Sequence, residues 1–176
     1  MKKMSKALLT IIIPTLNRSD FLIRLLNYLS HTHYKHRIAI GDSSDAFHVE
    51  RTKEAIKKIG KRLEIIYTQY PGLSCHGAQE KLIQLVDTPY IVSLPEDDFL
   101  VPNGLDKCIE FLENNSDYVA AHGLGVIVAR KPGEPCGRDL AIRNYRQTVI
   151  ENEGAKERLL QFLGDYSVPV FSVHRT

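Results

Sequence analysis

Residues 90–98 read YIVSLPEDD, an apolar run that ends in three consecutive acidic residues. The apolar and β-branched run Tyr90–Leu94 predicts a strand buried in a sheet. Glu96, Asp97 and Asp98 follow at the point where that strand should leave the sheet. Carboxylates this close repel one another, so the cluster favours a bound cation. Oxygen ligands suit hard divalent ions such as Mg2+ or Mn2+, and a phosphate held by such a metal is the first hypothesis.

Apolar runs alternate with amphipathic stretches along the chain, a pattern typical of βαβ units and a mostly parallel, Rossmann-like sheet flanked by helices. Strands are expected at 8–13, 37–41, 63–68, 90–94 and 118–121. Helices are expected after a cap at Ser19 or Asp20, and at 49–59, 77–86 and 102–114. Near the C-terminus, a small antiparallel excursion is expected from strands at 124–129 and 145–150, then a helix at 153–163 and a last strand at 168–173.

The size and charge of the chain narrow the functional classes. Its 176 residues are enough for one domain with a real core. The formal net charge is +2 with both signs scattered along the sequence, which gives no indication of a nucleic-acid partner. No segment approaches the roughly 20 apolar residues of a transmembrane span.

Cysteine usage indicates a reducing compartment. Cys75, Cys108 and Cys136 are odd in number and have no C-x-x-C spacing, which favours neither a disulfide framework nor a zinc site. The basic and apolar N-terminus lacks the small-residue pattern of a signal cleavage site. The predicted location is therefore the cytoplasm, either free or peripheral at the inner face of the membrane.

Three strand ends are expected to meet at one crevice. In a doubly wound sheet, ligands bind at the carboxyl ends of the strands where the strand order reverses. If the first and fourth strands are neighbours there, Thr15 and Asn17 face the acidic triplet, and Asp42 lines the same edge. The alternatives are that the acids cap the next helix or are simply solvated in a loop. Capping fits poorly because Asp98 lies four residues before Pro102, beyond the reach of an N-cap. The position at a strand end makes a solvated loop the less favoured interpretation.

Three blocks of sequence carry a family resemblance. Thr10–Arg18 reads TIIIPTLNR, Ile40–Asp45 reads IGDSSD and Thr88–Asp98 reads TPYIVSLPEDD. In this order and spacing they resemble the nucleotide-sugar glycosyltransferases of family 2, which have the GT-A fold. The resemblance implies a single GT-A-like domain over 1–176, with a donor-binding core at 1–123 and the start of an acceptor-side region at 124–176. A bacterial member that stops short of a complete catalytic domain is expected.

The resemblance also implies roles for individual residues. Those expected at the nucleotide sugar are Pro14, Thr15, Asn17, Arg18, Asp42, Glu96 and Asp97, with Asp42 accepting a hydrogen bond from the base. The triplet stands in place of the family's DXD motif, so that Asp98 or Asp97 holds Mn2+ or Mg2+ and its neighbour touches the ribose or the sugar. Backbone amides at the helix start within Pro71–Gln79 are expected to help hold the diphosphate.

By the same resemblance, the reaction is an inverting, metal-dependent sugar transfer from a UDP-linked donor to a saccharide or lipid-linked acceptor hydroxyl. The catalytic base is expected beyond Thr176, with candidates by residue type alone at Asp139, Glu151, Glu153 and Asp165. A fragment without the base should bind donor without efficient transfer. The alternative is a non-catalytic nucleotide-sugar-binding module. Nucleotidyl transfer and a phosphorelay receiver fit the positions of the acids and basic residues less well.

Other reactive side chains are assigned ordinary roles. His31, His33 and His36 lack the Cys or carboxylate spacing that would complete a zinc site. Cys75 and His76 are adjacent in sequence, and adjacent residues seldom face each other as a nucleophile and its base. The remaining group is basic and more typical of a solvated face than of an anion-steering surface: Arg138, Arg143 and Arg146.

Overall fold

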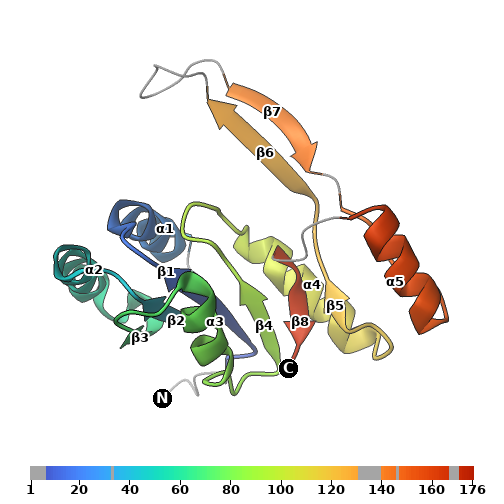
Figure 1. Cartoon of the computed structure of the whole chain (residues 1–176), viewed down its shortest axis with the longest axis horizontal. Helices are drawn as coiled ribbons and strands as arrows, with labels where there is room; N and C mark the ends of the chain where they lie inside the picture. The colour runs from blue at the N-terminus through green and yellow to red at the C-terminus, as the bar shows by residue number, and fades with distance from the viewer. Residues whose placement is uncertain (1–6, 33, 131–139, 146, 167–170) are drawn as a thin grey trace. The chain divides into compact units, whose positions relative to one another are not determined.

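The computed structural model describes residues 7–32, 34–130, 140–145, 147–166 and 171–176. The chain divides into two compact units, each shown in Figure 1: Met1–His122 together with Val170–Thr176, and Gly123–Pro169. The last residues therefore return to the first unit. The assignment of residues 124–176 to an acceptor-side region stays a prediction.

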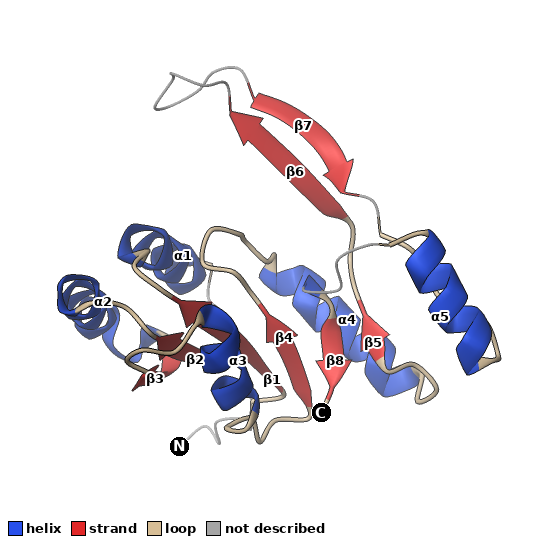
Figure 2. Ribbon diagram, viewed as in Figure 1, coloured by secondary structure: helices blue, strands red, loops and turns tan. Residues whose placement is uncertain are grey.

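A six-stranded sheet forms the first unit, in the order β3-β2-β1-β4-β8-β5 (Figure 2). The strands are β1 (Leu9–Thr15), β2 (Arg37–Asp42), β3 (Glu64–Gln69), β4 (Tyr90–Ser93), β5 (Ala120–Ala121) and β8 (Val173–Arg175). Strands β1 to β4 pair in parallel, and β8 is antiparallel to both of its neighbours. The helices are α1 (Ser19–His31), α2 (Ala46–Ile59), the 3-10 turn η1 (Gly60–Arg62), α3 (Cys75–Ile83) and α4 (Pro102–Asn114).

Helices cover both faces of this sheet because β1 and β2 are apolar on both sides. Ile11 and Ile13 belong to a large core with the buried stripe of α1, which consists of Leu22, Leu25, Leu26 and Leu29, and with α4. Ile12 belongs to a smaller core on the opposite face with Leu82 of α3. In Figure 2, α3 crosses in front of the sheet while α4 passes behind it. This arrangement confirms the predicted mostly parallel α/β architecture.

The prediction for the last strand was wrong in position. A strand was expected at 168–173, but residues 167–170 lie outside the described part of the chain, and β8 begins at Val173. Arg175 explains the shift: its guanidinium donates to the carbonyl of Tyr118 at 2.9 Å and to the hydroxyl of Tyr90 at 3.2 Å. These bonds hold Val173–Arg175 between β4 and β5, where β8 completes the sheet.

The start of α1 also differs from the prediction. Its N-cap is Arg18, and neither Ser19 nor Asp20 caps it; no side-chain cap hydrogen bond is present there. The hydroxyl of Ser19 instead bonds Nδ1 of His48 in α2 at 2.9 Å. Asp20 forms an ion pair with Arg51, which also lies in α2. The two residues join α1 to α2 rather than closing the end of α1.

The second unit contains a two-stranded antiparallel sheet, β6 (Gly125–Arg130) and β7 (Leu140–Tyr145), and helix α5 (Ala155–Gly164). The antiparallel excursion is confirmed, although its second strand was expected at 145–150. That stretch is bound to α5 and its C-terminal end instead. The hydroxyl of Thr148 donates to a carboxylate oxygen of Asp165 at 3.0 Å, and the side-chain amide of Gln161 donates to the carbonyl of Val149 at 2.8 Å.

Candidate functional site

Strands β1 and β4 lie side by side at the switch point of the first unit, as the sequence predicted. Ile12 pairs with Ser93, and the amide of Leu94 extends this pairing by donating to the carbonyl of Ile12 at 3.0 Å. On its other side β1 pairs with β2, whose last residue, Asp42, stands opposite Thr15. Parallel strands end at one edge, so the segments that follow these three strands meet there.

The turn after β1 is fixed by Asn17. Its φ of 56° lies in the left-handed region, which asparagine tolerates better than most residues. The side-chain amide nitrogen donates to the carboxylate of Asp45 at 3.0 Å, and the amide oxygen accepts from the Asp45 backbone at 2.8 Å. The backbone amide of Asn17 donates to the hydroxyl of Ser44 at 2.7 Å. Asn17 thus links the turn after β1 to the turn after β2 by hydrogen bonds.

This turn places Arg18 against the acidic triplet. Nε of Arg18 lies 3.2 Å from Glu96 Oε1, and Nη2 lies 2.8 Å from Asp97 Oδ2. The guanidinium also stacks over the ring of Phe21, with 4.5 Å between its central carbon and the ring centroid. The hydrogen bond to Asp97 and the charges of both carboxylates raise the pKa of Arg18 against the opposing effect of burial. The repulsion expected within the triplet is therefore partly neutralised by a side chain of the protein.

The three acids differ because they occupy a turn. The amide of Asp98 donates to the carbonyl of Pro95 at 3.3 Å, which reverses the chain over Glu96 and Asp97. Glu96 is only 6% exposed, whereas Asp98 is exposed. Burial raises the pKa of Glu96, and the neighbouring acids add to this while Arg18 opposes it. Partial burial and the charge of Asp97 raise the pKa of Asp98.

The segment after the triplet is anchored to α1 by aromatic contacts. The ring of Phe99 meets that of Tyr28 edge-on, with 5.0 Å between the centroids. The guanidinium of Arg24 stacks on both Phe21 and Phe99, at 5.0 and 5.4 Å. The hydroxyl of Tyr28 donates to the carbonyl of Leu100 at 3.2 Å. These contacts hold the segment that follows Asp98 against α1.

Asp42 lies at the end of β2 and is almost completely buried, with 1% exposed. One carboxylate oxygen accepts from the Ser44 amide at 2.9 Å, and the other accepts from the hydroxyl of Tyr67 at 2.7 Å. Burial and the bond to Asp42 raise the pKa of Tyr67. Beside these residues is an open groove of about 430 Å³ at the ends of β2 and β3, lined by Ser43, Ser44, Asp45, Ala46, Val49, Glu50, Lys53, Gln69, Pro71 and Gly72.

Two buried hydroxyls at these strand ends have no hydrogen-bond partner among the described residues: those of Thr15 and Ser43. Thr15 is 1% exposed and Ser43 is 6% exposed. An unsatisfied buried hydroxyl is costly, and a ligand that supplied a partner would remove that cost. Pro14, which precedes Thr15, is half-buried in β1.

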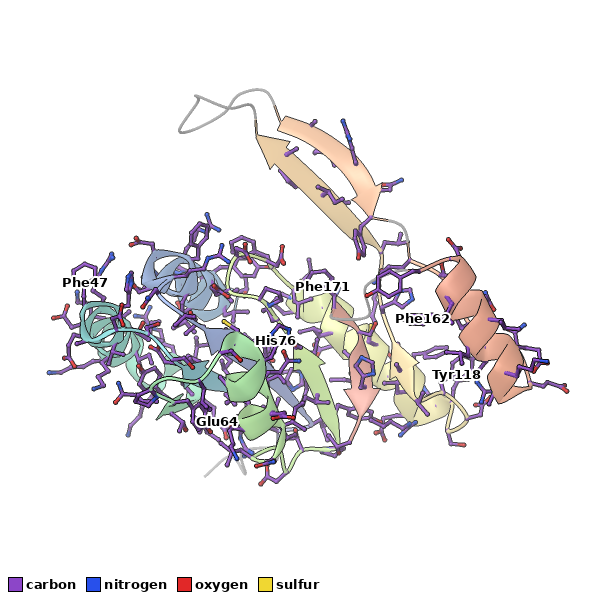
Figure 3. The ribbon with its side chains drawn as sticks, viewed as in Figure 1. Phe47, Glu64, His76, Tyr118, Phe162 and Phe171 are labelled. Atoms are coloured by element: carbon purple, nitrogen blue, oxygen red, sulfur yellow. The ribbon has the colours of Figure 1, made fainter. Side chains whose placement is uncertain are left out.

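Cys75 is close to this site and lies in the segment Pro71–Gln79, whose backbone amides were expected there, although no role was predicted for its thiol. It begins α3, whose N-cap Ser74 accepts from the Gly77 amide at 3.2 Å. Burial and the negative charge of Glu96 raise the pKa of the Cys75 thiol, while Arg18 opposes this. A thiol kept protonated is a poor nucleophile, which agrees with the rejection of a Cys75–His76 pair. His76 is exposed on α3 (Figure 3).

The donor set at the triplet fits a hard divalent ion in its chemistry. Glu96, Asp97 and Asp98 offer only carboxylate oxygens, and waters and phosphate oxygens commonly complete such a coordination shell. Within the described ranges, no group of three or more His, Cys, Asp or Glu side chains has the arrangement of a metal site. Arg18 shares the oxygens of Glu96 and Asp97, so these would need to be released before both could coordinate a metal.

Comparisons with known proteins identify the family. The profile described as Glycosyl transferase family 2 matches residues 10–172, almost the whole chain. The chain belongs to this family. The match agrees with the GT-A-type, mostly parallel α/β fold that the resemblance implied. No curated protein sequence gives a significant match.

Solved structures with the same fold are distant in sequence. The glycosyltransferase-family chain resembles S. aureus TarS, with 13% identity and a TM-score of 0.61 over 97% of this chain and 28% of TarS. A fragment, TarS 1-349, solved in complex with UDP-GlcNAc, gives 14% identity and a TM-score of 0.58, with 97% and 45% covered. The mannosyltransferase PcManGT from Pyrobaculum calidifontis, in complex with GDP-Man and Mn2+, gives 14% identity and a TM-score of 0.54, with 66% and 35% covered. The chain thus spans less than half the length of each.

The remaining predictions fall outside this site. His36 is buried and pairs with Asp106 at 2.9 Å, which gives it a structural partner. Cys75 and Cys108 are both free thiols. No helix in the described ranges is long and apolar enough to cross a membrane. Five residues lie outside the described residues: His33, Cys136, Arg138, Asp139 and Arg146.

Proposed function

We propose that the first unit of this glycosyltransferase binds a nucleoside-diphosphate sugar, with UDP as the first-choice nucleotide, at the edge where β1, β2 and β4 end. One observation carries the proposal: the switch point brings Thr15, Arg18, Asp42 and the acidic triplet to the ends of three adjacent strands. Complexes of related folds with UDP-GlcNAc and with GDP-Man and Mn2+ support the ligand class.

The nucleoside half of the donor is proposed to lie at the ends of β1 and β2, against Pro14 and Thr15. The unpartnered hydroxyl of Thr15 supports this because it is a buried group that lacks a partner. Asp42 keeps a second lone pair on each oxygen, so it can accept from a base N–H while it holds Ser44 and Tyr67. Asn17 acts mainly by clasping the two turns, since both ends of its side-chain amide already bind Asp45.

The diphosphate is proposed to lie between the acidic turn and the start of α3. Mn2+ or Mg2+, held by Asp98 and Asp97, would neutralise the charge that develops on the leaving diphosphate. Glu96 pairs with Arg18 at 3.2 Å and is proposed to hold its guanidinium at the acidic turn until the donor binds. The amide of Gly77 is already occupied by Ser74, so the amides of Cys75 and His76 are the ones proposed for phosphate.

Transfer is proposed to follow an inverting course, in which a saccharide or lipid-linked hydroxyl attacks the sugar and loses its proton to a carboxylate base. Glu151, Glu153 and Asp165 belong to the second unit, and none of them is assigned this role. A cytoplasmic location, free or at the inner membrane face, remains part of the proposal. The competing function is a module that binds the nucleotide sugar without transferring the sugar. Release of free sugar from UDP-sugars, or its transfer to an acceptor, would support the enzyme over the binding module.

The test is thermal stabilisation of residues 1–176 by UDP, GDP and their sugar conjugates, each with Mn2+ and with chelator. A ligand that binds only the folded chain raises its melting temperature. We expect stabilisation by at least one nucleotide, larger with Mn2+, and loss of the metal-dependent part in Asp97→Asn and Asp98→Asn. Glu54→Asn, an exposed substitution on α2, is the control. An unchanged metal-dependent shift in both site variants would show that the wrong carboxylates were assigned.

A further inference from the structure

The carboxylates proposed to face the donor are already paired with a cation of the protein. Among the described residues, the ion pairs to the triplet come from Arg18, which reaches Glu96 at 3.2 Å and Asp97 at 2.8 Å. The Glu96 side chain is 7% exposed, whereas those of Arg18 and Asp97 are 42% and 39% exposed. The pair is therefore buried on one side and open to solvent on the other, and exposed ion pairs are weak enough to exchange.

The backbone holds Arg18 in place while its side chain can move. Its carbonyl accepts from the amides of Phe21 and Leu22, at 3.1 and 3.2 Å, as α1 begins. The preceding residue, Asn17, is fixed by its bonds to Asp45. A long arginine stem on such an anchor can turn its guanidinium between two partners without rearranging the fold. In the observed position, the guanidinium also stacks on the Phe21 ring, 4.5 Å from its centroid.

A guanidinium pairs with phosphate in the same forked geometry that it uses for carboxylates. We propose that Arg18 is an exchangeable counter-ion: without nucleotide it neutralises Glu96 and Asp97, and on donor binding it moves to the diphosphate and releases those oxygens for a divalent cation. This inference rests on the proposed function. It deepens that function by making Arg18 the residue that couples nucleotide binding to metal binding.

The exchange makes two ligands cooperate. The nucleotide removes a competitor of the metal, and by linkage the metal strengthens nucleotide binding by the same factor. The chain then has low affinity for Mn2+ alone, because a metal that arrives first must displace Arg18 without any compensating phosphate contact. Removing the guanidinium should strengthen binding of the metal alone and weaken binding of the nucleotide alone.

The decisive experiment compares wild type, Arg18→Gln and Arg24→Gln. Arg24 is a matched control because it also stacks on Phe21 but forms no ion pair with the triplet among the described residues. Binding of Mn2+ without nucleotide is measured from the free-ion signal in electron paramagnetic resonance. We expect Arg18→Gln to bind about five- to tenfold more tightly than wild type, as the loss of a pair of about 1 kcal/mol implies, and Arg24→Gln to stay within about twofold. Equal or weaker binding by Arg18→Gln would overturn the inference.

A second titration tests the move to phosphate. UDP binding in chelator should weaken about fivefold or more in Arg18→Gln and stay near wild type in Arg24→Gln. Tighter Mn2+ binding with unchanged UDP binding would make Arg18 a fixed counter-ion and overturn the exchange. If wild type binds no nucleotide under any condition, the proposed function fails, and the Mn2+ comparison still reports separately whether Arg18 shields the carboxylates.

Discussion

Thr15 and Thr10 lie in the same strand, are equally buried at 1% exposed, and differ in whether the hydroxyl has a partner. The hydroxyl of Thr10 bonds that of Thr88 at 2.8 Å, whereas the hydroxyl of Thr15 has no partner among the described residues. A structural hydroxyl is satisfied within the protein, while one kept for a ligand is satisfied only when the ligand binds. Removing the hydroxyl of Thr15 should therefore affect the stability of the fold and the binding of nucleotide in opposite directions.

Replacing Thr15 by Val should therefore leave the free energy of unfolding unchanged or raise it by up to about 1 kcal/mol, because it removes an unsatisfied polar group. The same change should reduce stabilisation by UDP. Thr10→Val, the control, should lower stability by about 1 kcal/mol because the buried bond to Thr88 is lost, although Thr88 keeps its bond to the carbonyl of Tyr90. Urea denaturation with and without UDP measures both effects. A large loss of stability in Thr15→Val would mean that this hydroxyl has a partner in the folded protein.

The burial of Glu96 leads us to expect a difference in melting temperature between wild type and Glu96→Gln that depends on pH. Burial raises its pKa in the folded chain, so ionisation of Glu96 lowers stability once the pH exceeds that value. Glu96→Gln should have a higher melting temperature than wild type near pH 7. The gain should shrink as the pH falls and should be gone at about pH 3, below the ordinary pKa of Glu, where the carboxyl is protonated in both folded and unfolded chains. Glu54→Gln should show no such trend, and a less stable Glu96→Gln at pH 7 would show that the Arg18 pair outweighs burial.

The sequence predicted that Thr15, Asp42 and the triplet lie at or just after the ends of strands, and the structure agrees, while their roles at a donor stay predictions. The contacts they make could not be foreseen. That Arg18 pairs with residues 78 and 79 positions away depends on the left-handed turn at Asn17. Helix α3 begins at Cys75, two residues before the predicted Gly77. A one-residue difference in a turn redirects a side chain, and pattern alone does not resolve it.

Helix α3 packs closely on β2 at Gly41, next to Asp42. A Cβ at this position would lie 3.1 Å from two atoms of Leu82 and 3.3 Å from the Tyr70 ring. Gly41→Ala should therefore destabilise the chain by about 1–3 kcal/mol by pushing α3 away from the sheet. The double variant Gly41→Ala with Leu82→Ala should lose less than the sum of the single changes, since the second removes the clash. Additive losses would contradict this contact.

At the level of elements, strands and helices with uniform apolar patterns were predicted well. Helix α4 begins at Pro102 and buries Leu105, Cys108, Ile109 and Leu112, as its spacing indicated. The failures concern short elements placed by long-range bonds. β7 and β8 were expected about five residues from where they occur, because side chains of Thr148, Gln161 and Arg175 determine which backbone joins which neighbour.

In the first unit, strand β8 lies between the parallel strands and β5 and joins them into one sheet by its backbone pairing. It bonds β4 on one side and β5 on the other, and Arg175 ties it to carbonyls at the end of α4 and beyond. Arg175→Met should lower stability by about 2–3 kcal/mol through lost charge-assisted bonds. Arg62→Met, which loses only bonds within its own turn, should cost less than about 1 kcal/mol. Equal losses measured by urea denaturation would argue against β8 as the connection.

We propose above that carboxylates at the rim of this sheet join a divalent cation to a nucleoside diphosphate. A crystal structure with UDP and Mn2+, with anomalous scattering to locate manganese, tests it most directly. We expect a manganese peak at Asp97 and Asp98, with the diphosphate beside it and Arg18 turned from Glu96 toward phosphate. An ordered nucleotide elsewhere, or manganese absent while Arg18 still pairs with Glu96 and Asp97, would contradict it.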